Sequence, residues 1–313
     1  MKIIYYFLSF IIVFIIFTVG IVLKIYLSKN DRLLDENENF LTIICRIKDE
    51  HFLVPSFVEY YLSQGVDMIY FIDDDSSKPY NIINPKVQFV KSTLARKKMD
   101  NMADVKDLFK KIKSAWVMLI DADEFIHTKG FDTTIRGMLE TEFVNSDCVL
   151  VPWIMYTFNK REKDSNEVIN DYRWRWNHDI RHPHPNKDRK NGCKYNKIEC
   201  KSIFKTDSFK PGNQHVPYPI KTNVRVTESL YNTNVNLSPF LVVREKDILN
   251  GLMLCNHYRF TSIDAIKKKC SRNSFNNYNF MDNCVNNCIL SDYAEVYDDI
   301  LAKKWKNIKS TIS

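Results

Sequence analysis

The segment AWVMLIDADEF, which runs from Ala115 to Phe125, contains three carboxylates near its end. Asp121, Asp123 and Glu124 follow an apolar run that has the length of a buried strand. Two like charges about 4 Å apart repel by roughly 4 kcal/mol at an effective dielectric constant near 20, so a site that gathers them needs a cation. Alternate residues of an extended chain point the same way, and oxygen ligands suit Mg²⁺ or Mn²⁺. The spacing of Asp121 and Asp123 therefore predicts a divalent-metal site that holds the diphosphate of a nucleotide.

Two further polar clusters follow short apolar runs that are typical of buried strands, residues 41–47 (LTIICRI) and 68–72 (MIYFI). The first run leads into RIKDE (46–50), and the second leads directly into Asp73–Asp75. Asp73 is a candidate for binding the ribose or base of a nucleotide, whereas Asp75 and Ser76 are also suited to capping a turn. Solvated loop acids are the structural alternative for every one of these acidic clusters.

The order of apolar runs places the three clusters at one edge of a sheet. Further strands are predicted at 87–90 and 116–120, and helices are predicted within 49–65 and 99–112, where apolar residues recur at helical spacing. This order predicts an α/β fold with a mostly parallel, Rossmann-like sheet flanked by helices. Ligands of such sheets bind beyond the carboxyl ends of the strands, so we expect the clusters to meet on one rim.

The composition is that of a globular protein and excludes several functions. Of 313 residues, 45% are hydrophobic and 27% are charged, as in ordinary domains. The net charge of +7 comes from scattered lysines without a nucleic-acid-binding motif, so we expect no nucleic-acid partner. The absence of G-x-G-x-x-G and Walker A sequences disfavours a dinucleotide dehydrogenase and a P-loop enzyme. The eight cysteines permit disulfides without requiring them.

The amino-terminal segment is predicted to cross a membrane. Residues 3–23 carry no charged side chain, and Lys2 and Lys24 bracket them. At about 1.5 Å per residue, this helix would span the hydrocarbon core of a bilayer. We predict a transmembrane signal anchor at 1–28, a short polar stem at 29–40 and a catalytic domain at 41–313. The lipid bilayer is the expected partner of residues 3–23, and the flanking charges leave the orientation open.

Five segments, in a fixed order from about residue 41 to 270, carry a resemblance to a known family. They are RIKDEHFLVPSFVEYYLSQGVDMIYFIDDDS, WVMLIDADEF, VPWIMYTFNK, KSIFKTDSFKPGNQH and NHYRFTSIDAIKKKC. Together they resemble the GT-A glycosyltransferases, and more narrowly glycosyltransferase family 92 and its relatives in the family 2 superfamily. The first motif reads K-D-E where that pattern has K-N-E, and the stretch after Trp153 has no glycine where the pattern has one, which leaves the acceptor open.

The resemblance implies a GT-A-like fold and the transfer of a sugar from a nucleotide sugar, first of all a UDP-sugar, to a hydroxyl of a glycan or glycoprotein. It implies Mn²⁺ or Mg²⁺ as the cofactor, inversion at the sugar, and a single-pass membrane protein with the type II orientation of the Golgi or ER. The expected metal ligands are Asp121, Asp123, His215 and His257. The expected nucleotide contacts are Arg46, Glu50, Asp73, Asp74, Asp75 and Lys201.

An inverting transferase needs a carboxylate that deprotonates the acceptor hydroxyl. The sequence leaves four candidates open, with Glu167 first because it follows the tryptophan segment; they are Glu167, Glu124, Asp171 and Asp179. Ordinary structural roles remain open for these acids and for the two histidines. Two other functions also remain, a nucleotidyltransferase and an inactive membrane-anchored binding protein. The intact D-x-D sequence favours an enzyme over the latter, and the lack of a glycine-rich first loop disfavours the former.

Overall fold

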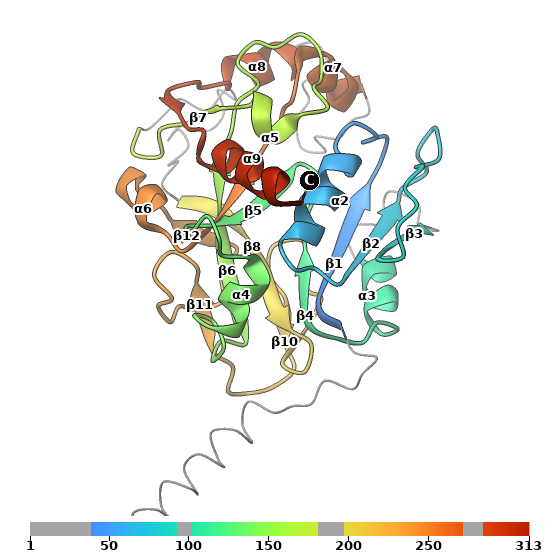
Figure 1. Ribbon diagram of the computed structural model, residues 1–313, viewed down its shortest axis with the longest axis vertical. Helices are drawn as coiled ribbons and strands as arrows, with labels where there is room; N and C mark the ends of the chain where they lie inside the picture. Colours follow the sequence, from blue (N-terminus) through green and yellow to red (C-terminus); the bar gives the residue numbers. More distant parts are fainter. Residues whose placement is uncertain (1–38, 93–101, 181–196, 272–283, 313) are drawn as a thin grey trace, which may run out of the picture. The chain divides into compact units, whose positions relative to one another are not determined.

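A ten-stranded sheet organises the part of the chain that the structure describes (Figure 1). The structure is a computed structural model, and it describes residues 39–92, 102–180, 197–271 and 284–312. These residues all belong to one compact unit, Asn39–Ser313. Eight strands form a continuous path in the order β3-β2-β1-β4-β8-β6-β13-β5, and β11 and β12 pair with β6 and β8 beside it.

The first four strands along the chain form the parallel half of the sheet. They are β1 (Asn39–Ile47), β2 (Met68–Asp73), β3 (Val87–Lys91) and β4 (Ser114–Leu119). Neighbours in the order β3-β2-β1-β4 are all parallel, with Ile43 opposite both Ile69 and Met118. Parallel neighbours need a crossover, and the helices α2 (Val54–Ser63) and α3 (Ala103–Phe109) lie in two of them. The predicted strands at 41–47, 68–72, 87–90 and 116–120 are confirmed, as are the two helical segments.

The other half of the sheet is mixed, and it corrects the predicted fold. Its strands are β5 (Glu124–Thr128), β6 (Cys148–Met155), β8 (Lys197–Lys205) and β13 (Met253–His257). β8 runs antiparallel to both β4 and β6, β5 runs antiparallel to β13, and β13 is parallel to β6. The prediction of a mostly parallel, GT-A-like sheet is therefore wrong. The prediction extended the parallel pattern of the first 120 residues to the whole sheet. Only four residues separate β4 from β5, and this connection is too short for the crossover that a parallel pair needs.

The remaining elements are short and lie around this sheet. β11 (Val226–Glu228) is parallel to β6, and β12 (Phe240–Val242) is antiparallel to β8. Two separate ribbons pair β9 (Phe209–Lys210) with β10 (Tyr218–Pro219), and β7 (Trp174–Arg175) with β14 (Val296–Tyr297). The other described helices are α4 (Ile135–Glu140), α5 (Val168–Asp171), α6 (Glu245–Asn250), α7 (Ile263–Ser271), α8 (Cys284–Leu290) and α9 (Ile300–Ile312).

Both faces of the sheet are covered by apolar side chains. Successive residues of a strand point to opposite faces, so Ile43 belongs to one buried cluster and Ile44 to the other. On the first face, Tyr60 of α2 packs edge-to-face on Trp305 of α9, with ring centroids 5.6 Å apart. Figure 1 shows α2 and α9 side by side in front of the sheet. On the second face, α3 buries Val105 in the smaller cluster. Packing on both faces explains why the strand segments read as continuous apolar runs.

A disulfide between Cys270 and Cys284 joins the end of α7 to the start of α8. The sequence had left disulfides open. Cys288, one turn further along α8, is a free thiol whose sulfur lies within 4.8 Å of the two bonded sulfurs. The bridge ties α8 to α7, the helix that carries Lys268 and Lys269.

The predicted membrane topology is not supported by the structure. In residues 39–92, 102–180, 197–271 and 284–312, no helix combines the length and the apolar character that crossing a bilayer requires. The longest described helix, α9, has 13 residues, which is too short for the roughly 20 that a span needs. The predicted anchor and stem at 1–28 and 29–40 lie outside the described residues except for Asn39 and Phe40. The prediction of a single-pass membrane protein in the Golgi or ER is therefore corrected for the chain that the structure describes.

Candidate functional site

The turn between β4 and β5 forms an acidic tip, residues 120–124, on one rim of the sheet. Since β1, β2, β6 and β13 are all parallel to β4 through the chain of pairings, their carboxyl ends lie on this same rim. The turn is closed by two hydrogen bonds: the Asp121 amide donates to Glu124 Oε2 at 2.9 Å, and the Glu124 amide donates to the Asp121 carbonyl at 3.1 Å. In the β5–β13 ladder His257 lies opposite Glu124. Strand pairing thus brings residues 121–124 and 257 together.

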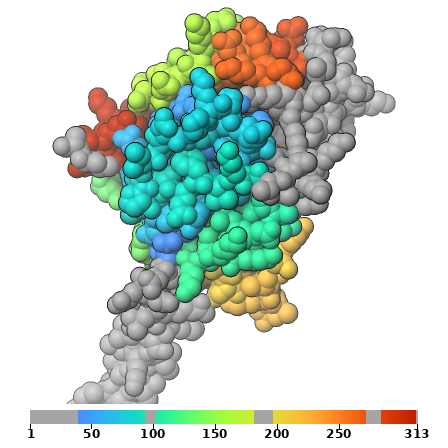
Figure 2. Space-filling view, turned by 90° about the vertical axis from the view of Figure 1, so that its right-hand side faces the viewer, coloured from blue at the N-terminus to red at the C-terminus, as the bar shows by residue number. Residues whose placement is uncertain are grey.

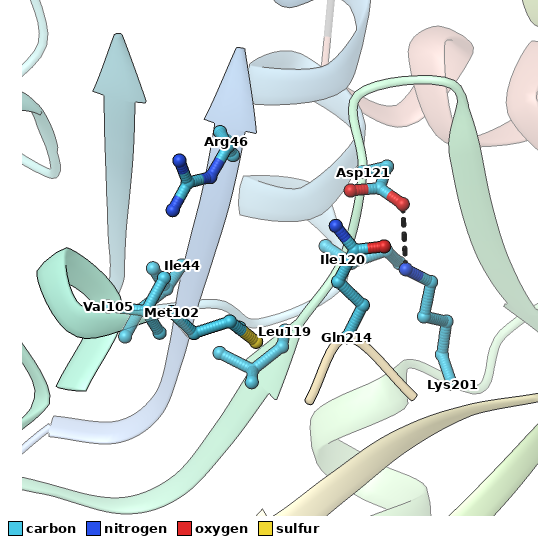
Figure 3. Close-up of a pocket in the computed structure, with 9 residues that line it drawn as sticks. All are labelled: Ile44, Arg46, Met102, Val105, Leu119, Ile120, Asp121, Lys201 and Gln214. Atoms are coloured by element: carbon cyan, nitrogen blue, oxygen red, sulfur yellow. Dashed lines mark hydrogen bonds and ion pairs between the residues drawn. The ribbon is translucent and has the colours of Figure 1, made fainter. Parts of the chain in front are cut away.

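Lys201 provides a buried positive charge beneath the tip. Because β8 is antiparallel to β4, Lys201 points toward the end of β4, with its Nζ 2.7 Å from Asp121 Oδ2 and 3.2 Å from Glu124 Oε2 (Figure 3). The side chains of Lys201 and Glu124 are 1% and 0% exposed, whereas that of Asp121 is 41% exposed. Burial acts to lower the pKa of Lys201, but Asp121 and Glu124 outweigh it and raise this pKa. Burial raises the pKa of Glu124 well above its usual range against the opposing effect of Lys201.

Asp123, Glu124 and His257 form a group that could hold a metal ion. One ligand atom from each lies within 4.8 Å of the other two, and all three residues are buried. Asp123 Oδ1 is 3.7 Å from His257 Nε2, too far for a hydrogen bond. Glu124 Oε1 and His257 Nδ1 are buried and have no hydrogen-bond partner among the described residues. Burial holds the pKa of His257 well below its usual value, which keeps the imidazole neutral as metal ligation requires. These residues therefore fit a divalent cation.

A cleft of about 300 Å³ opens beside Asp123. Glu50, from the segment after β1, and Lys268 and Lys269, from α7, line it together with Tyr258. Lys269 Nζ lies 3.2 Å from Asp123 Oδ2 and donates to the Arg259 carbonyl at 2.7 Å. Burial and the nearby Asp123 raise the pKa of Glu50 to about 8. The cleft thus places carboxylates against lysines, an arrangement that suits an anionic ligand bound with a cation.

A smaller cavity of about 30 Å³ lies on the other side of the tip (Figure 3). Asp121 and Lys201 border it on one side, Arg46 of β1 lies across from them, and Gln214 projects between them. Arg46 Nη2 pairs with Asp104 Oδ1 of α3 at 2.5 Å, and its buried Nη1 has no partner among the described residues. Asp121 therefore faces one cavity and Asp123 the other, so the D-x-D sequence separates two spaces.

The Asp73–Asp75 cluster has a mainly structural role. Asp73 Oδ1 accepts a hydrogen bond from the Ser76 amide at 3.0 Å and so caps the turn after β2. The Asp74 carbonyl accepts from Lys48 Nζ at 2.8 Å. Asp75 is exposed and adopts a left-handed backbone conformation with φ of 57°. Neither the 300 Å³ cleft nor the 30 Å³ cavity is lined by any of the three, so the alternative that they shape a turn describes them better.

His215 lies near the site but outside the metal group. Its Nδ1 is 3.0 Å from the Cys200 carbonyl, and its ring meets Trp153 edge-to-face at 5.2 Å. Trp153 also packs on His257 at 4.1 Å, so the tryptophan lies between the two predicted histidine ligands. Burial lowers the pKa of His215. The group of described residues that includes Asp123 and Glu124 contains His257 and not His215.

Three of the four proton-acceptor candidates are engaged elsewhere. Glu167 is exposed at the start of α5, where its Oε2 accepts from Asn170 Nδ2 at 2.8 Å. Asp171 accepts from Ser165 Oγ at 2.5 Å. Asp179 accepts from the Glu245 amide at 3.0 Å. Glu124 is the one candidate of the four that lies at the tip.

Sequence reasoning missed Lys269, which pairs directly with Asp123. The lysine run at 267–269 lies in the last of the five segments that carry the family resemblance. Its distance of 146 residues from Asp123 gave no sign of the pairing. Ser262 Oγ caps the start of α7 by accepting a hydrogen bond from the Ala265 amide at 2.9 Å.

The sequence matches no model of a known protein family, and no curated protein matches it either.

Proposed function

We propose that this protein is a metal-dependent glycosyltransferase that moves a sugar from a nucleotide sugar, with UDP-sugars as the first candidates, to a hydroxyl of a glycan or glycoprotein. The observation that carries the proposal is the group Asp123, Glu124 and His257 at the edge of the lysine-lined cleft. The order of motifs in the sequence, which resembles that of glycosyltransferases, supports the same conclusion.

The charges of the cleft suit a diphosphate. A nucleotide diphosphate would meet Lys268 and Lys269 on α7 and Lys48 beyond β1, which all line the cleft. Without a cation, the phosphates would be repelled by Asp123 in the same cleft. A divalent cation held by Asp123, Glu124 and His257 would remove this repulsion and neutralise charge on the departing diphosphate. Mn²⁺ or Mg²⁺ suits the two carboxylates.

The ion pair with Lys201 gives the two aspartates different roles in this proposal. Asp121 is already paired with this lysine at 2.7 Å, so we assign Asp121 to shaping the tip and the smaller cavity. Asp123 is the aspartate that reaches the metal group and the cleft. Within the proposal Glu50 replaces Glu167 and Asp171 as the candidate proton acceptor, because it lines the cleft beside Asp123 and they do not.

Ligand-dependent stability tests this function without knowledge of the acceptor. The purified protein is heated with Mn²⁺ and each of UDP-glucose, UDP-galactose, UDP-N-acetylglucosamine and GDP-mannose. A donor present at 100 times its Kd stabilises the folded protein by about 2.7 kcal/mol. For a unit of this size we expect a rise in Tm of about 5 °C. Omitting Mn²⁺ or adding EDTA should abolish the rise.

Asp123→Asn is the matched variant, and Asp75→Asn is its control. Asp123→Asn should lose both the Mn²⁺-dependent rise in Tm and the hydrolysis or transfer of the donor while it keeps the far-UV circular dichroism of the wild type. Asp75→Asn removes an exposed acid of the second cluster and should behave as the wild type does. If no donor raises Tm or turns over with Mn²⁺, the proposal fails.

A further inference from the structure

A second cavity of about 290 Å³ lies apart from the acidic tip and shares no lining residue with the cleft. Residues 157–159, 161 and 171–174 line it, and we call it the Trp174 pocket. It backs onto the cleft: Tyr172, which lines the pocket, donates through its hydroxyl to the carbonyl of Thr261 at 2.6 Å, and Thr261 lines the cleft. Figure 2 shows the segment around residue 160 beside α7 at the top of the molecule, in agreement with a 2.9 Å hydrogen bond from the Ile263 amide to the Arg161 carbonyl.

The pocket contains a buried polar group without a partner. Thr157 is 2% exposed, and its Oγ1 has no hydrogen-bond partner among the described residues. Leaving such a hydroxyl unpaired is unfavourable, and a ligand hydroxyl that reached Thr157 Oγ1 would pair it. Further polar groups line the same pocket, including Asn159 and the carboxylate of Asp171. The pocket is therefore equipped to exchange several hydrogen bonds with a polar ligand.

Exposed aromatic rings border these polar groups. Trp174 lines the pocket and is 37% exposed, and it meets the 51% exposed Tyr297 edge-to-face at 5.5 Å. The two residues are cross-strand neighbours in the β7–β14 ribbon, which holds both rings in place. Arg173 also holds this arrangement, because its Nη1 donates to the Tyr297 hydroxyl at 3.3 Å. A rigid aromatic face beside hydrogen-bonding groups suits a ligand with one apolar face and a polar edge.

The loop at residues 158–160 has an unfavourable backbone conformation that contacts with the rest of the fold maintain. Asn159 and Lys160 both adopt left-handed conformations, with φ of 46° and 59°. Asp292 fixes them: its Oδ1 accepts from the Phe158 amide at 3.1 Å and its Oδ2 from the Lys160 amide at 3.4 Å. Such conformations are costly for a lysine and persist where the surroundings impose them, often at ligand sites.

We propose that the Trp174 pocket binds one pyranose ring of an oligosaccharide. The C–H face of the sugar would stack on Trp174, and its hydroxyls would bond to Thr157, Asn159 and Asp171. The charges favour a neutral sugar over a phosphate or an acidic peptide: Arg161 lies 3.6 Å from Asp171 and over the ring of Tyr172, and Arg173 is held by the Asn170 carbonyl and by Tyr297. As the site of a sugar unit of the acceptor, the pocket would extend the proposed transferase function, and only this last step rests on that function.

The experiment measures sugar binding without a nucleotide or metal. Maltotriose, chitotriose, mannotriose and N-acetyllactosamine are titrated into the full-length protein, in EDTA, by isothermal calorimetry and by saturation-transfer NMR. We expect at least one to bind with a Kd of roughly 0.1–5 mM, which corresponds to about 3–5.5 kcal/mol of binding free energy. Trp174→Ala should weaken that binding at least tenfold. The near-isosteric Thr157→Val should weaken it about fivefold while keeping the circular dichroism of the wild type.

Phe131→Ala is the control, because Phe131 is an aromatic residue with 50% exposure that lines neither the Trp174 pocket nor the cleft. It should leave sugar binding unchanged. The inference is overturned if none of the four sugars binds, if Trp174→Ala and Thr157→Val both bind as the wild type does, or if an acidic peptide competes equally well. Asp123→Asn separates the two proposals: it should abolish donor binding and retain sugar binding. If the protein binds one of the sugars but no nucleotide sugar, the sugar site at the Trp174 pocket is supported and the proposed transferase function is refuted.

Discussion

Replacing Lys201 by methionine should destabilise the protein by about 3–5 kcal/mol. Methionine has nearly the same length and is apolar, so the change removes the charge and little volume. It leaves Glu124, which is 0% exposed, without the cation that opposes the rise of its pKa, so this acid must stay charged without a partner or take up a proton. Removing one partner of a buried ion pair typically costs this amount. Asp121 adds little, because it is 41% exposed and water screens an exposed pair to about 1 kcal/mol or less.

The assay is thermal unfolding followed by circular dichroism at pH 8, in EDTA so that no divalent ion replaces the lost charge. The compact unit is larger than 250 residues, and for this size 1 kcal/mol corresponds to about 2 °C in Tm. We therefore expect Lys201→Met to lower Tm by about 6–10 °C. Lys205→Met is the matched control on the same strand, because Lys205 is 27% exposed and its Nζ lies 3.9 Å from Asp147. It should lower Tm by about 2 °C or less.

A double variant separates the charge effect from a packing effect. In Lys201→Met with Glu124→Gln the buried charge disappears along with its partner, so at least half of the lost stability should return. The reasoning is refuted if Lys201→Met unfolds within 2 °C of the wild type, or if the double variant is no more stable than the single one.

Two further predictions concern groups away from the tip. The disulfide joins residues with a sequence separation of 14, and for such a loop the lost chain entropy of the unfolded state stabilises the fold by about 3 kcal/mol. The double variant Cys270→Ser with Cys284→Ser should lose this amount of stability in urea unfolding, and dithiothreitol should bring the wild type to the same midpoint. A wild type whose midpoint dithiothreitol leaves unchanged would contradict the bridge. Burial lowers the pKa of His127 from 6.5 to about 4, so the unfolded state binds the proton more readily and wild-type stability should fall as pH drops from 6.5 toward 4. His127→Gln should remove about 2 kcal/mol of that loss by pH 4.5, measured as the difference between urea curves at pH 7.5 and 4.5, and a difference that does not change with pH would refute the assignment.

Local patterns identified the parallel half of the sheet. Residues 43–45 and 116–120 are apolar on consecutive positions because β1 and β4 are covered on both faces, and such runs are visible without knowing the partner strands. The spacing of Asp121 and Asp123 likewise marked the tip, since a turn that directly follows a buried strand must lie at the edge of the sheet. These features depend on neighbours in sequence, and therefore they could be predicted.

The direction of β8 and β5 could not be predicted in the same way. A strand of apolar residues reads the same whether its neighbour is parallel or antiparallel, because side-chain alternation does not record strand direction. Yet the antiparallel direction of β8 aims Lys201 at the tip, and the pairing of β5 with β13 sets His257 against Glu124. The mistaken parallel sheet has this cause, whereas the missed pair of Lys269 with Asp123 depends on where α7 packs against the tip, 146 residues further along the chain.

The sequence by itself determined which residues could carry the chemistry: an acidic turn after a buried strand and, through the family resemblance, Lys201 and two histidines. The tertiary structure decided which of them meet, bringing Asp123, Glu124 and His257 together while leaving Asp75 and Glu167 at the surface. The physical reason is range. Helix and strand periodicity arises from contacts within a few residues, whereas a site joins residues more than a hundred positions apart through strand pairings that burial and hydrogen bonding select only in the complete fold.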